Sequence, residues 1–476
     1  MKSRRKPKFF EKVEIIDAGS EGKAVTKPEE MVVFVPFAAP GDIVDLEVIK
    51  KKKNYFEGFI KQFHKYSDYR VEPECKHFGT CGGCKWQHLD YKWQLNFKQK
   101  QVKDSLDRIA KVSYPDIRPI LAAPAPYYYR NKLEYTFSNR KWLTDGAPSS
   151  DKSAEEMSGL GFHLPGMFDR ILDIDHCYLQ ADPSNEIRLF VRDFALENKL
   201  SFYNVRNHEG LLRNLIIRNT QKGEVMVILV ISAEDEVVIN QLLPALMTKF
   251  EQITALFYVV NDKKNDVIND LELIHVAGDT ELIEEMQSPV DGFPALKFGI
   301  APVSFYQTNA KQAEALYKTA FEMAAVSSDD KVYDLYTGAG TIALYFARFV
   351  KEVIGVEYVE QAVKDAAQNA KRNAIGNASF FAGDMAKVLD EEFVVAHGKP
   401  DIIVTDPPRA GMHPKVITQL LAIQADKIVY ISCNPATQAR DLQLLDALYE
   451  VKAVQPVDMF PQTQHVENVV LLHKRV

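Results

Sequence analysis

The sequence predicts an α/β protein of three parts: an N-terminal β-barrel, a central β-rich region, and a C-terminal parallel sheet with helices on both faces. Three observations lead to this prediction. Short β-branched runs broken by turn residues occupy residues 11–62, strand patterns dominate residues 127–299, and strands alternate with helices after residue 307. The chain is therefore expected to combine two β-rich modules with one α/β module.

The length and composition are those of an ordinary globular chain. Its 476 residues exceed what one hydrophobic core serves, so we expect domains at residues 1–65, 66–300 and 301–476. Hydrophobic residues make up 46% and charged residues 26%, which excludes a disordered or fibrous protein. No window holds eighteen successive apolar residues, and the basic start lacks the apolar segment of a signal peptide. We expect a cytoplasmic protein with no membrane partner.

The net charge of −7 hides a gradient along the chain. Residues 1–120 carry +7 and residues 121–476 carry −14. Three basic runs in the front part are interleaved with Phe, Tyr and Trp: Lys2-Arg4-Arg5-Lys6-Lys8, Lys50-Lys51-Lys52-Lys53 and Lys92-Lys98-Lys100-Lys103. Such runs suit phosphate contacts combined with base stacking, although each could also be a solvated face.

The N-terminal segment has the pattern of about five short strands. Apolar or β-branched runs at 13–16, 31–35, 43–49 and 55–60 are separated by glycine-rich and proline-rich turns. Short strands at this spacing predict a small barrel of the oligonucleotide-binding kind, whose open face commonly holds single-stranded nucleic acid. A purely structural barrel is the alternative.

The cysteines point to a metal site. There are five, Cys75, Cys81, Cys84, Cys177 and Cys433, and three of them fall within ten residues, which is a poor disulfide framework. The spacing Cys75-x5-Cys81-x2-Cys84 with a distant Cys177 favours iron–sulfur ligation. Structural zinc is the alternative, although it usually takes two Cys-x2-Cys units.

The remaining elements follow from periodicity. An amphipathic helix is predicted at 91–109, a mobile excursion at 144–161 and a hairpin loop at 261–266. Strands are predicted at 133–137, 212–218, 224–232, 255–260, 271–276, 332–336, 353–357, 379–382, 402–405, 428–432, 452–457 and 469–473, and helices at 342–350, 360–374, 414–424 and 437–447. The alternation after residue 307 predicts a doubly wound sheet that binds its ligand at the carboxyl ends of its strands.

Carboxylates at those strand ends predict an adenosine site. The turn from Asp334 to Thr341 follows an apolar strand and opens a helix, but it lacks the third glycine of a dinucleotide fingerprint. Glu357 ends the next strand, where a carboxylate can accept both ribose hydroxyls, and Asp384 ends the third. An adenosine without pyrophosphate suggests S-adenosylmethionine. A carboxylate of this kind is, on its own, more often a helix cap or a solvated loop residue, and it is the ordered set that favours the functional interpretation.

Two more residues at this edge carry reactive groups. Cys433 follows a strand and precedes a helix, where the helix N-terminus is expected to lower the pKa of its thiol, and Glu467 precedes the last strand. A thiolate that adds to carbon 6 of a pyrimidine makes carbon 5 nucleophilic, and a base must then remove the carbon 5 proton. We assign Cys433 as nucleophile and Glu467 as base; a buried core thiol is the alternative. The target base would have to be flipped out of its stack.

At this point the chain resembles bacterial RNA uracil-5-methyltransferases, in particular the iron–sulfur branch that acts on 23S ribosomal RNA and carries an N-terminal TRAM domain. The motifs that carry the resemblance are Cys75-x5-Cys81-Gly82-Gly83-Cys84, Phe305-Tyr306-Gln307-Thr308-Asn309, the turn from Asp334 to Gly340, Asp406-Pro407-Pro408-Arg409, Ser432-Cys433-Asn434-Pro435 and His465-Val466-Glu467-Asn468. They occur in the family's order and span nearly the whole chain.

The resemblance implies an OB-like TRAM barrel, a central iron–sulfur domain and a Rossmann-like class I methyltransferase domain, on which the helix near 91–110 would pack. It implies a four-iron, four-sulfur cluster on Cys75, Cys81, Cys84 and Cys177. It also implies S-adenosylmethionine contacts at Gln307, Tyr336, Glu357, Asp384 and Asp406, with Cys433 and Glu467 as the catalytic pair. The implied partner is RNA, with 23S ribosomal RNA favoured, and a monomer is expected.

Several rival interpretations exist. Asp-Pro-Pro after the fourth strand also occurs in methyltransferases that act on amino groups of adenine or guanine, but these need no cysteine. DNA cytosine-5 methyltransferases place their cysteine after the fourth strand, whereas Cys433 follows the fifth. Two alternatives stay open: a transfer RNA uracil-5-methyltransferase, and an RNA-binding iron–sulfur protein whose methyltransferase half is inactive.

Overall fold

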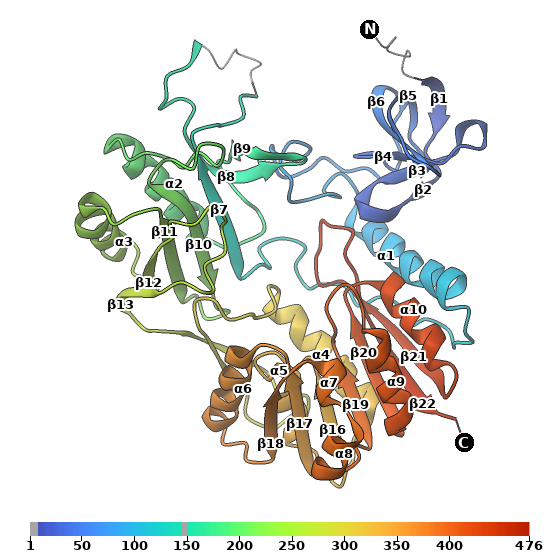
Figure 1. Cartoon of the computed structure of the whole chain (residues 1–476). Helices are drawn as coiled ribbons and strands as arrows, with labels where there is room; N and C mark the ends of the chain where they lie inside the picture. The colour runs from blue at the N-terminus through green and yellow to red at the C-terminus, as the bar shows by residue number, and fades with distance from the viewer. Residues whose placement is uncertain (1–7, 145–150, 476) are drawn as a thin grey trace.

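The computed structural model describes residues 8–144 and 151–475 (Figure 1). The chain forms three lobes: an N-terminal one, a central one, and a C-terminal one in contact with both. The first basic run, apart from Lys8, and part of the predicted excursion at 144–161 lie outside the described residues. Among the described residues, no helix has the length and apolarity needed to cross a bilayer.

The N-terminal lobe is a six-stranded sheet in the order β1-β5-β6-β4-β3-β2. Its strands are β1 (Phe9–Glu14), β2 (Asp17–Ala18), β3 (Ala24–Thr26), β4 (Val33–Val35), β5 (Ile43–Lys51) and β6 (Phe56–Lys65). The two edge strands β1 and β2 are consecutive in the chain and only two residues apart, so the sheet must curl until its edges meet. Alternate residues such as Val33 and Val35 point inward and fill the interior.

The central lobe is a seven-stranded sheet in the order β13-β12-β11-β10-β7-β8-β9, with helices on one face. Its elements are β7 (Lys132–Ser138), β8 (Gly159–Leu164), β9 (Met167–Asp173), α2 (Ser184–Glu197), β10 (Leu212–Asn219), β11 (Val225–Ile231), α3 (Leu243–Lys249), β12 (Ile253–Val260) and β13 (Leu273–Gly278). Every residue of β11 is buried, which is why its sequence is continuously apolar rather than alternating.

The two faces of β11 belong to different cores. Val227 and Leu229 pack toward α2 and α3, whereas Met226 and Ile228 pack toward the hairpin of β14 (Leu282–Met286) and β15 (Leu296–Ile300). The core that contains Met226 and Ile228 continues into the C-terminal lobe through α4 (Ala310–Ala324). The central and C-terminal lobes therefore share one hydrophobic core.

The C-terminal lobe is a seven-stranded sheet in the order β18-β17-β16-β19-β20-β22-β21. Its further elements are β16 (Lys331–Leu335), α5 (Thr341–Ala347), β17 (Glu352–Glu357), α6 (Glu360–Arg372), β18 (Ala378–Ala382), α7 (Met385–Val388), α8 (Glu391–His397), β19 (Ile402–Thr405), α9 (Pro414–Ile423), β20 (Lys427–Ser432), α10 (Pro435–Leu445), β21 (Tyr449–Val457) and β22 (Glu467–Lys474). The first five strands in this order are parallel, and β22 and β21 are antiparallel to their neighbours. The predicted doubly wound sheet is confirmed.

Strand residues of the C-terminal sheet alternate between its two faces. Val429 packs with α4 and α5, whereas Ile428 and Tyr430 pack with α9 and α10. Helix α1 (Tyr91–Ser105) and the π-helical turn Leu106–Ala110 pack on this second face, beside α10, although they come from the first quarter of the chain (Figure 1). The sheet is thus covered on both faces, as its apolar strands require.

Candidate active site

The carboxyl ends of the parallel strands bring the predicted site residues to one edge of the C-terminal sheet. The turn at 336–340 follows β16, Glu357 ends β17, Asp384 lies two residues after β18, Asp406 follows β19 and Cys433 follows β20. Glu467 begins the antiparallel strand β22 and reaches the same edge from the opposite direction.

The turn after β16 requires a left-handed backbone. Tyr336, Gly338 and Gly340 have φ angles of 65°, 54° and 80°. A Cβ at Gly340 would lie 2.9 Å from the Cβ of Ala366 on α6, whereas one at Gly338 would meet no atom within 4 Å. The glycine at 340 therefore allows close packing of the turn on α6, and the glycine at 338 borders open space.

Asp334 holds this turn in place. Its buried carboxylate accepts hydrogen bonds from Thr337 Oγ1 at 2.5 Å and from the Ala343 amide at 2.9 Å. Burial raises the pKa of Asp334 to about 7. Asp334 thus ties the Thr337 side chain of the turn to the first helical turn of α5.

Glu357 and Asp384 are both partly engaged by backbone amides. Glu357 accepts from the Gly338 amide at 3.1 Å and from the Val359 amide at 2.9 Å, and Asp384 caps α7 by accepting from the Ala386 amide. Both side chains are half-buried. Each carboxylate oxygen carries two lone pairs, so either residue can still accept hydrogen bonds from a ligand.

Tyr336 and Gln307 flank this region. Burial raises the pKa of Tyr336 to about 12, and the charges of Asp441, Asp384 and Glu357 contribute, so the phenol lies close to these carboxylates. The backbone oxygen of Gln307 accepts a hydrogen bond from Asn131 Nδ2 at 2.9 Å, and its side chain interacts with the buried Tyr317 hydroxyl. Gln307 is therefore held from both the central and the C-terminal lobe.

Cys433 and Glu467 meet because of the pairing of β20 with β22. Ser432, the last residue of β20, pairs with Asn468 of β22. Cys433, which follows β20, therefore lies beside Glu467, which begins β22. Glu467 is 5% exposed and Cys433 is half-buried. Burial and the neighbouring Asp406 raise the pKa of Glu467 well above its usual value, and burial raises the pKa of Asp406 to about 7.

The expectation that a helix N-terminus lowers the pKa of Cys433 is wrong. Burial raises this pKa to about 11, and the charges of Glu467 and Asp406 add to the effect, although Arg409 opposes it. The first position of α10 is Pro435, which has no N–H, and the side chain of Asn434 accepts from the Ala436 amide. The helix N-terminus is therefore engaged by its own cap.

The segment before Glu467, of which the sequence singled out only His465 and Val466, supports Glu467. Residues 458–466 connect β21 to β22 and are held by α1 and its neighbours. Lys98 Nζ lies 2.5 Å from Asp458 Oδ1 and donates to the Phe460 carbonyl at 3.0 Å, and both side chains of the ion pair are fully buried. Gln94 accepts from the Gln462 amide at 2.9 Å. The position of Glu467 thus depends on residues far away in the sequence.

Lys98 corrects the interpretation of the third basic run. It is an internal ion-pair partner rather than a phosphate contact, while Lys100 and Lys103 form exposed ion pairs with Asp104 and Asp107. Gln94, Lys98 and Val102 recur every four residues and are all buried, so the buried face of the helix has a readable period. The spacing of the buried residues, rather than the charge of the run, therefore indicates that Lys98 is internal.

The four cysteines predicted as ligands line one cavity of about 490 Å³ between the loop at 75–84 and the loop carrying Cys177. Burial raises the pKa of Cys84 to about 12 and that of Cys177 to about 11, and the other cysteines contribute to both shifts. Within residues 8–144 and 151–475, no three His, Cys, Asp or Glu side chains converge closely enough to hold a single metal ion.

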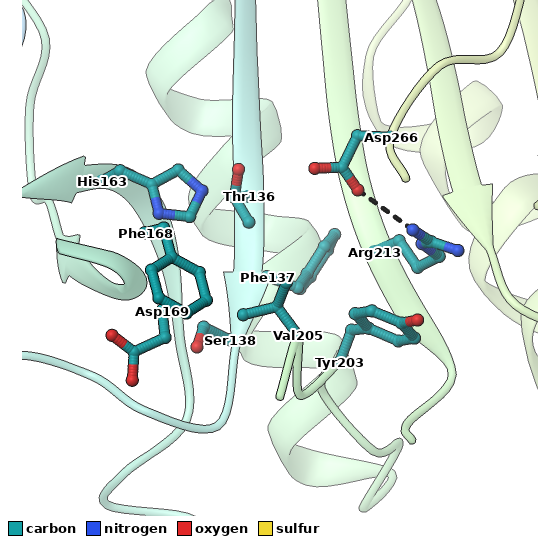
Figure 2. A pocket seen from close by; sticks show the side chains of 10 residues that line it. All are labelled: Thr136, Phe137, Ser138, His163, Phe168, Asp169, Tyr203, Val205, Arg213 and Asp266. Atoms are coloured by element: carbon teal, nitrogen blue, oxygen red, sulfur yellow. Dashed lines mark hydrogen bonds and ion pairs between the residues drawn. The ribbon is translucent and has the colours of Figure 1, made fainter. Parts of the chain in front are cut away.

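A second cavity, of about 360 Å³, lies in the central lobe, and all its lining residues fall between 136 and 266 (Figure 2). Its most buried polar group, the Arg213 guanidinium, pairs with Asp266 at 3.0 Å and lies 4.2 Å from the Tyr203 ring centroid. No strand end of the C-terminal sheet contributes to it. This cavity is separate from the edge that gathers Cys433, Asp406 and Glu467.

A doubly wound sheet with a glycine turn and carboxylates at one edge is typical of α/β enzymes that bind a nucleotide-like ligand at the carboxyl ends of their strands. The tRNA (uracil-5-)-methyltransferase family model matches residues 276–475. The chain therefore carries this family's signature over nearly all of its C-terminal lobe.

Relatives that match nearly the whole chain support the same assignment. The chain is 52% identical over 459 residues to an RNA methyltransferase of Bacteroides thetaiotaomicron, covering 96% of this chain and all of that one. It is 49% identical over 471 residues to an RNA methyltransferase of Porphyromonas gingivalis, covering 97% and 99%. The crystal structure of Pyrococcus abyssi tRNA (uracil-54, C5)-methyltransferase with S-adenosyl-L-homocysteine is 29% identical, with a TM-score of 0.75 over 97% of this chain and all of that one. The chain belongs to the RNA (uracil-5-)-methyltransferase family and is an S-adenosylmethionine-dependent RNA methyltransferase.

Proposed function

We propose that this enzyme methylates carbon 5 of a uridine in 23S ribosomal RNA, with Cys433 as nucleophile and Glu467 as base. The observation that carries the proposal is the juxtaposition of the Cys433 thiol with the Glu467 carboxyl through the pairing of Ser432 with Asn468. A thiol and a carboxyl side by side suit addition to one carbon of a double bond and proton removal from the next.

The residues act in order. The Cys433 thiol loses its proton to solvent, and the resulting thiolate bonds to carbon 6 of the flipped-out uracil, which moves the electron pair of the ring double bond to carbon 5. Carbon 5 takes the methyl group that S-adenosylmethionine supplies as a sulfonium, and S-adenosylhomocysteine leaves. Glu467 removes the carbon 5 proton, and the bond from sulfur to carbon 6 breaks as the ring double bond re-forms.

The raised pKa values favour uncharged forms of Asp406, Glu467 and Cys433 until a ligand binds. Asp406 and Glu467 lie close together, and their mutual repulsion and burial favour protonated forms, as burial does for Cys433. A bound cation at this edge would favour the ionised form of all three groups. We propose that Gln307, Tyr336, Glu357, Asp384 and Asp406 hold the methyl donor, since all five lie around the strand ends described above.

A covalent trap tests the nucleophile. RNA carrying 5-fluorouridine should form an adduct that survives denaturing electrophoresis, because the fluorine at carbon 5 cannot be removed as a proton. Cys433→Ala should form no adduct and should lose at least about 10³-fold in kcat/KM, equivalent to about 4 kcal/mol. Glu450→Gln, at an exposed position on β21, serves as the control for adduct formation. An adduct with Cys433→Ala would reject the assignment.

A transfer RNA uridine is the second candidate target. The solved relative from Pyrococcus abyssi is named for uracil 54 of tRNA, and its chain is covered completely. Nucleoside mass spectrometry of both RNAs from a deletion strain separates the two candidates. Loss of 5-methyluridine from 23S ribosomal RNA alone supports our proposal, and loss from transfer RNA alone supports the second candidate.

We further propose that Cys75, Cys81, Cys84 and Cys177 hold a four-iron, four-sulfur cluster. The fit rests on the four thiols lining one cavity and on the effect of these thiols on one another's pKa. A cluster of several irons needs such a space, whereas zinc needs four ligands at about 2.3 Å from one point. The loop carrying Cys84 continues into Lys85 and Trp86, whose amides both donate to the Gln462 carbonyl, so an ordered cluster loop would help to order the segment before Glu467.

Metal analysis tests this assignment. Protein purified without oxygen should be brown and should contain about four irons per chain. Cys84→Ser should lower the iron content. Stoichiometric zinc in place of iron, or iron content unchanged in Cys84→Ser, would contradict it.

A further inference from the structure

Four aromatic side chains form a ledge beside the cysteine cavity: Tyr127, Tyr128, His176 and Tyr178. The ring of Tyr178 lies 4.5 Å from that of His176, 6.0 Å from that of Tyr128 and 6.2 Å from that of Tyr127. The Tyr128 hydroxyl is 3.1 Å from His176 Nε2. Tyr128 remains 45% exposed, so this aromatic ledge presents a ring to the surface.

The backbone at Tyr128 is strained. Its φ angle is 54°, a conformation that bulky residues rarely adopt. The amides of Tyr128 and Arg130 each donate at 2.7 Å, to the carbonyls of Tyr178 and Leu179, and hold this strained segment against the loop that carries Cys177. Strained backbone that keeps an aromatic ring at the surface is typical of a functional site.

Two of the three residues after Tyr128 contact segments of the candidate active site. The Tyr129 hydroxyl donates to the Pro461 carbonyl at 2.9 Å, in the segment that precedes Glu467. The Asn131 amide donates to the Thr308 carbonyl at 2.8 Å, and Asn131 Nδ2 donates to that of Gln307 at 2.9 Å. Three extended residues span at most about 10 Å. Tyr128 is therefore at most about 10 Å from Asn131, the residue that contacts Gln307 and Thr308 beside the proposed methyl-donor site.

The charges around the ledge disfavour a phosphate. The carboxylates of Glu74 and Asp182 lie near Tyr128, and the nearby Lys76 is paired with Asp175. A base has a π face that stacks on aromatic rings, and its amino groups tolerate carboxylates, whereas a phosphate is repelled by them. The ledge therefore suits a base rather than the backbone of a nucleic acid.

We propose that this aromatic ledge, with Tyr128 as its outer ring, stacks an unpaired base of the substrate RNA next to the target uridine. The proposal rests on the proposed function, since it presumes that the uridine enters the edge that carries Cys433. Stacking on aromatic side chains is the usual way in which proteins hold unpaired RNA bases, and it tolerates any base. The ledge would steady the strand while the neighbouring uridine is flipped out.

Fluorescence anisotropy of the full chain with a labelled oligouridylate of about 12 nucleotides tests the proposal. Tyr128→Ala should weaken Kd by about 5- to 150-fold, which corresponds to the 1–3 kcal/mol of one stacked base. Tyr128→Phe should stay within about twofold, because the ring remains. Phe168→Ala, which removes another strongly exposed ring of the central lobe, should leave Kd unchanged.

Two more measurements separate stacking from other roles. The slope of log Kd against log salt should be the same for Tyr128→Ala and the unaltered chain, since no phosphate contact is lost. Tyr128→Leu, which keeps an apolar bulk for folding, should weaken Kd as Tyr128→Ala does. Unchanged Kd in both variants would overturn the proposal. If Kd is unchanged and alkylation of Cys177 becomes faster, the ledge covers the cysteine cavity instead of binding RNA. If Tyr128→Ala weakens Kd as expected but the deletion strain loses no 5-methyluridine, the proposed function fails while the ledge stands as a surface that binds a base.

Discussion

At the scale of single residues, Glu467 offers the clearest separation of chemical steps. Glu467→Gln keeps the size of the side chain but removes the base, so addition and methyl transfer can proceed while proton removal cannot. We expect kcat to fall about 10²- to 10⁴-fold and a methylated protein–RNA adduct to persist on denaturing gels. Glu450→Gln, at an exposed position on β21, is the matched control and should behave like the unaltered chain. Turnover of Glu467→Gln at the normal rate would contradict the assignment.

Thiol reactivity reports the electrostatics around Cys433. Asp406 raises the pKa of Cys433, and its own pKa is about 7. Asp406→Asn should therefore lower the pKa of Cys433 and speed its alkylation at pH 8, by about tenfold for each unit of pKa lost. At pH 5 Asp406 is protonated, so the two proteins should differ little.

The measurement is iodoacetamide labelling at several pH values, with the Cys433 peptide followed by mass spectrometry. Asp446→Asn, whose carboxylate pairs with Arg475 elsewhere in the lobe, is the control. Equal labelling of Asp406→Asn and the unaltered chain at pH 8 would show that the two side chains do not interact.

At the scale of elements, α1 and the segment 458–466 form one unit. Lys98→Met would leave the Asp458 carboxylate buried without its cation, so we expect a loss of about 3 kcal/mol in the free energy of unfolding. Urea unfolding followed by circular dichroism measures this loss. Lys103→Met on the same helix removes an exposed ion pair with Asp107 and should cost less than about 1 kcal/mol. Equal losses in the two variants would mean that the buried pair has no special role.

Helix α1 also illustrates what sequence reasoning can and cannot find. Its limits follow from periodicity, because a helix that packs on a sheet must bury one face. The sequence does not say that this face holds a buried lysine whose partner lies 360 residues away. Helices α2 and α4 were not predicted, since the surrounding strand patterns were stronger, although α4 has an Asn309 cap and regularly spaced buried residues.

The sequence predicts those parts of the candidate site that depend on residue type and on the order of the strands. The sheet places Cys433, Asp406 and Glu467 at one edge because parallel strands end there and β22 returns to it. The pKa of Cys433 was not predictable, since it depends on burial and on two carboxyls that approach in space. The supporting role of Asp458 was missed for the same reason.

At the scale of the whole molecule, the basic N-terminal lobe and the acidic remainder should contribute differently to RNA binding. Lys50, Lys51, Lys52 and Lys53 are exposed, and none forms an ion pair with a described residue. Replacing all four by Gln should weaken RNA binding and reduce the slope of log Kd against log salt by up to about 3, because each phosphate contact contributes about 0.7. Filter binding at several salt concentrations measures this slope, and Lys318→Gln on α4 is the control. Weaker binding with an unchanged slope would exclude phosphate contacts.

The distance along the chain between Lys98 and Asp458 has a consequence for biosynthesis. At translation speeds of about 5–20 residues per second, the 360 residues between them take roughly 20–70 s to make. During that time α1 carries an ammonium group on the face that must later be buried, so stable docking awaits its counter-ion. Stable docking of α1 therefore follows the synthesis of Asp458, nine residues before that of Glu467.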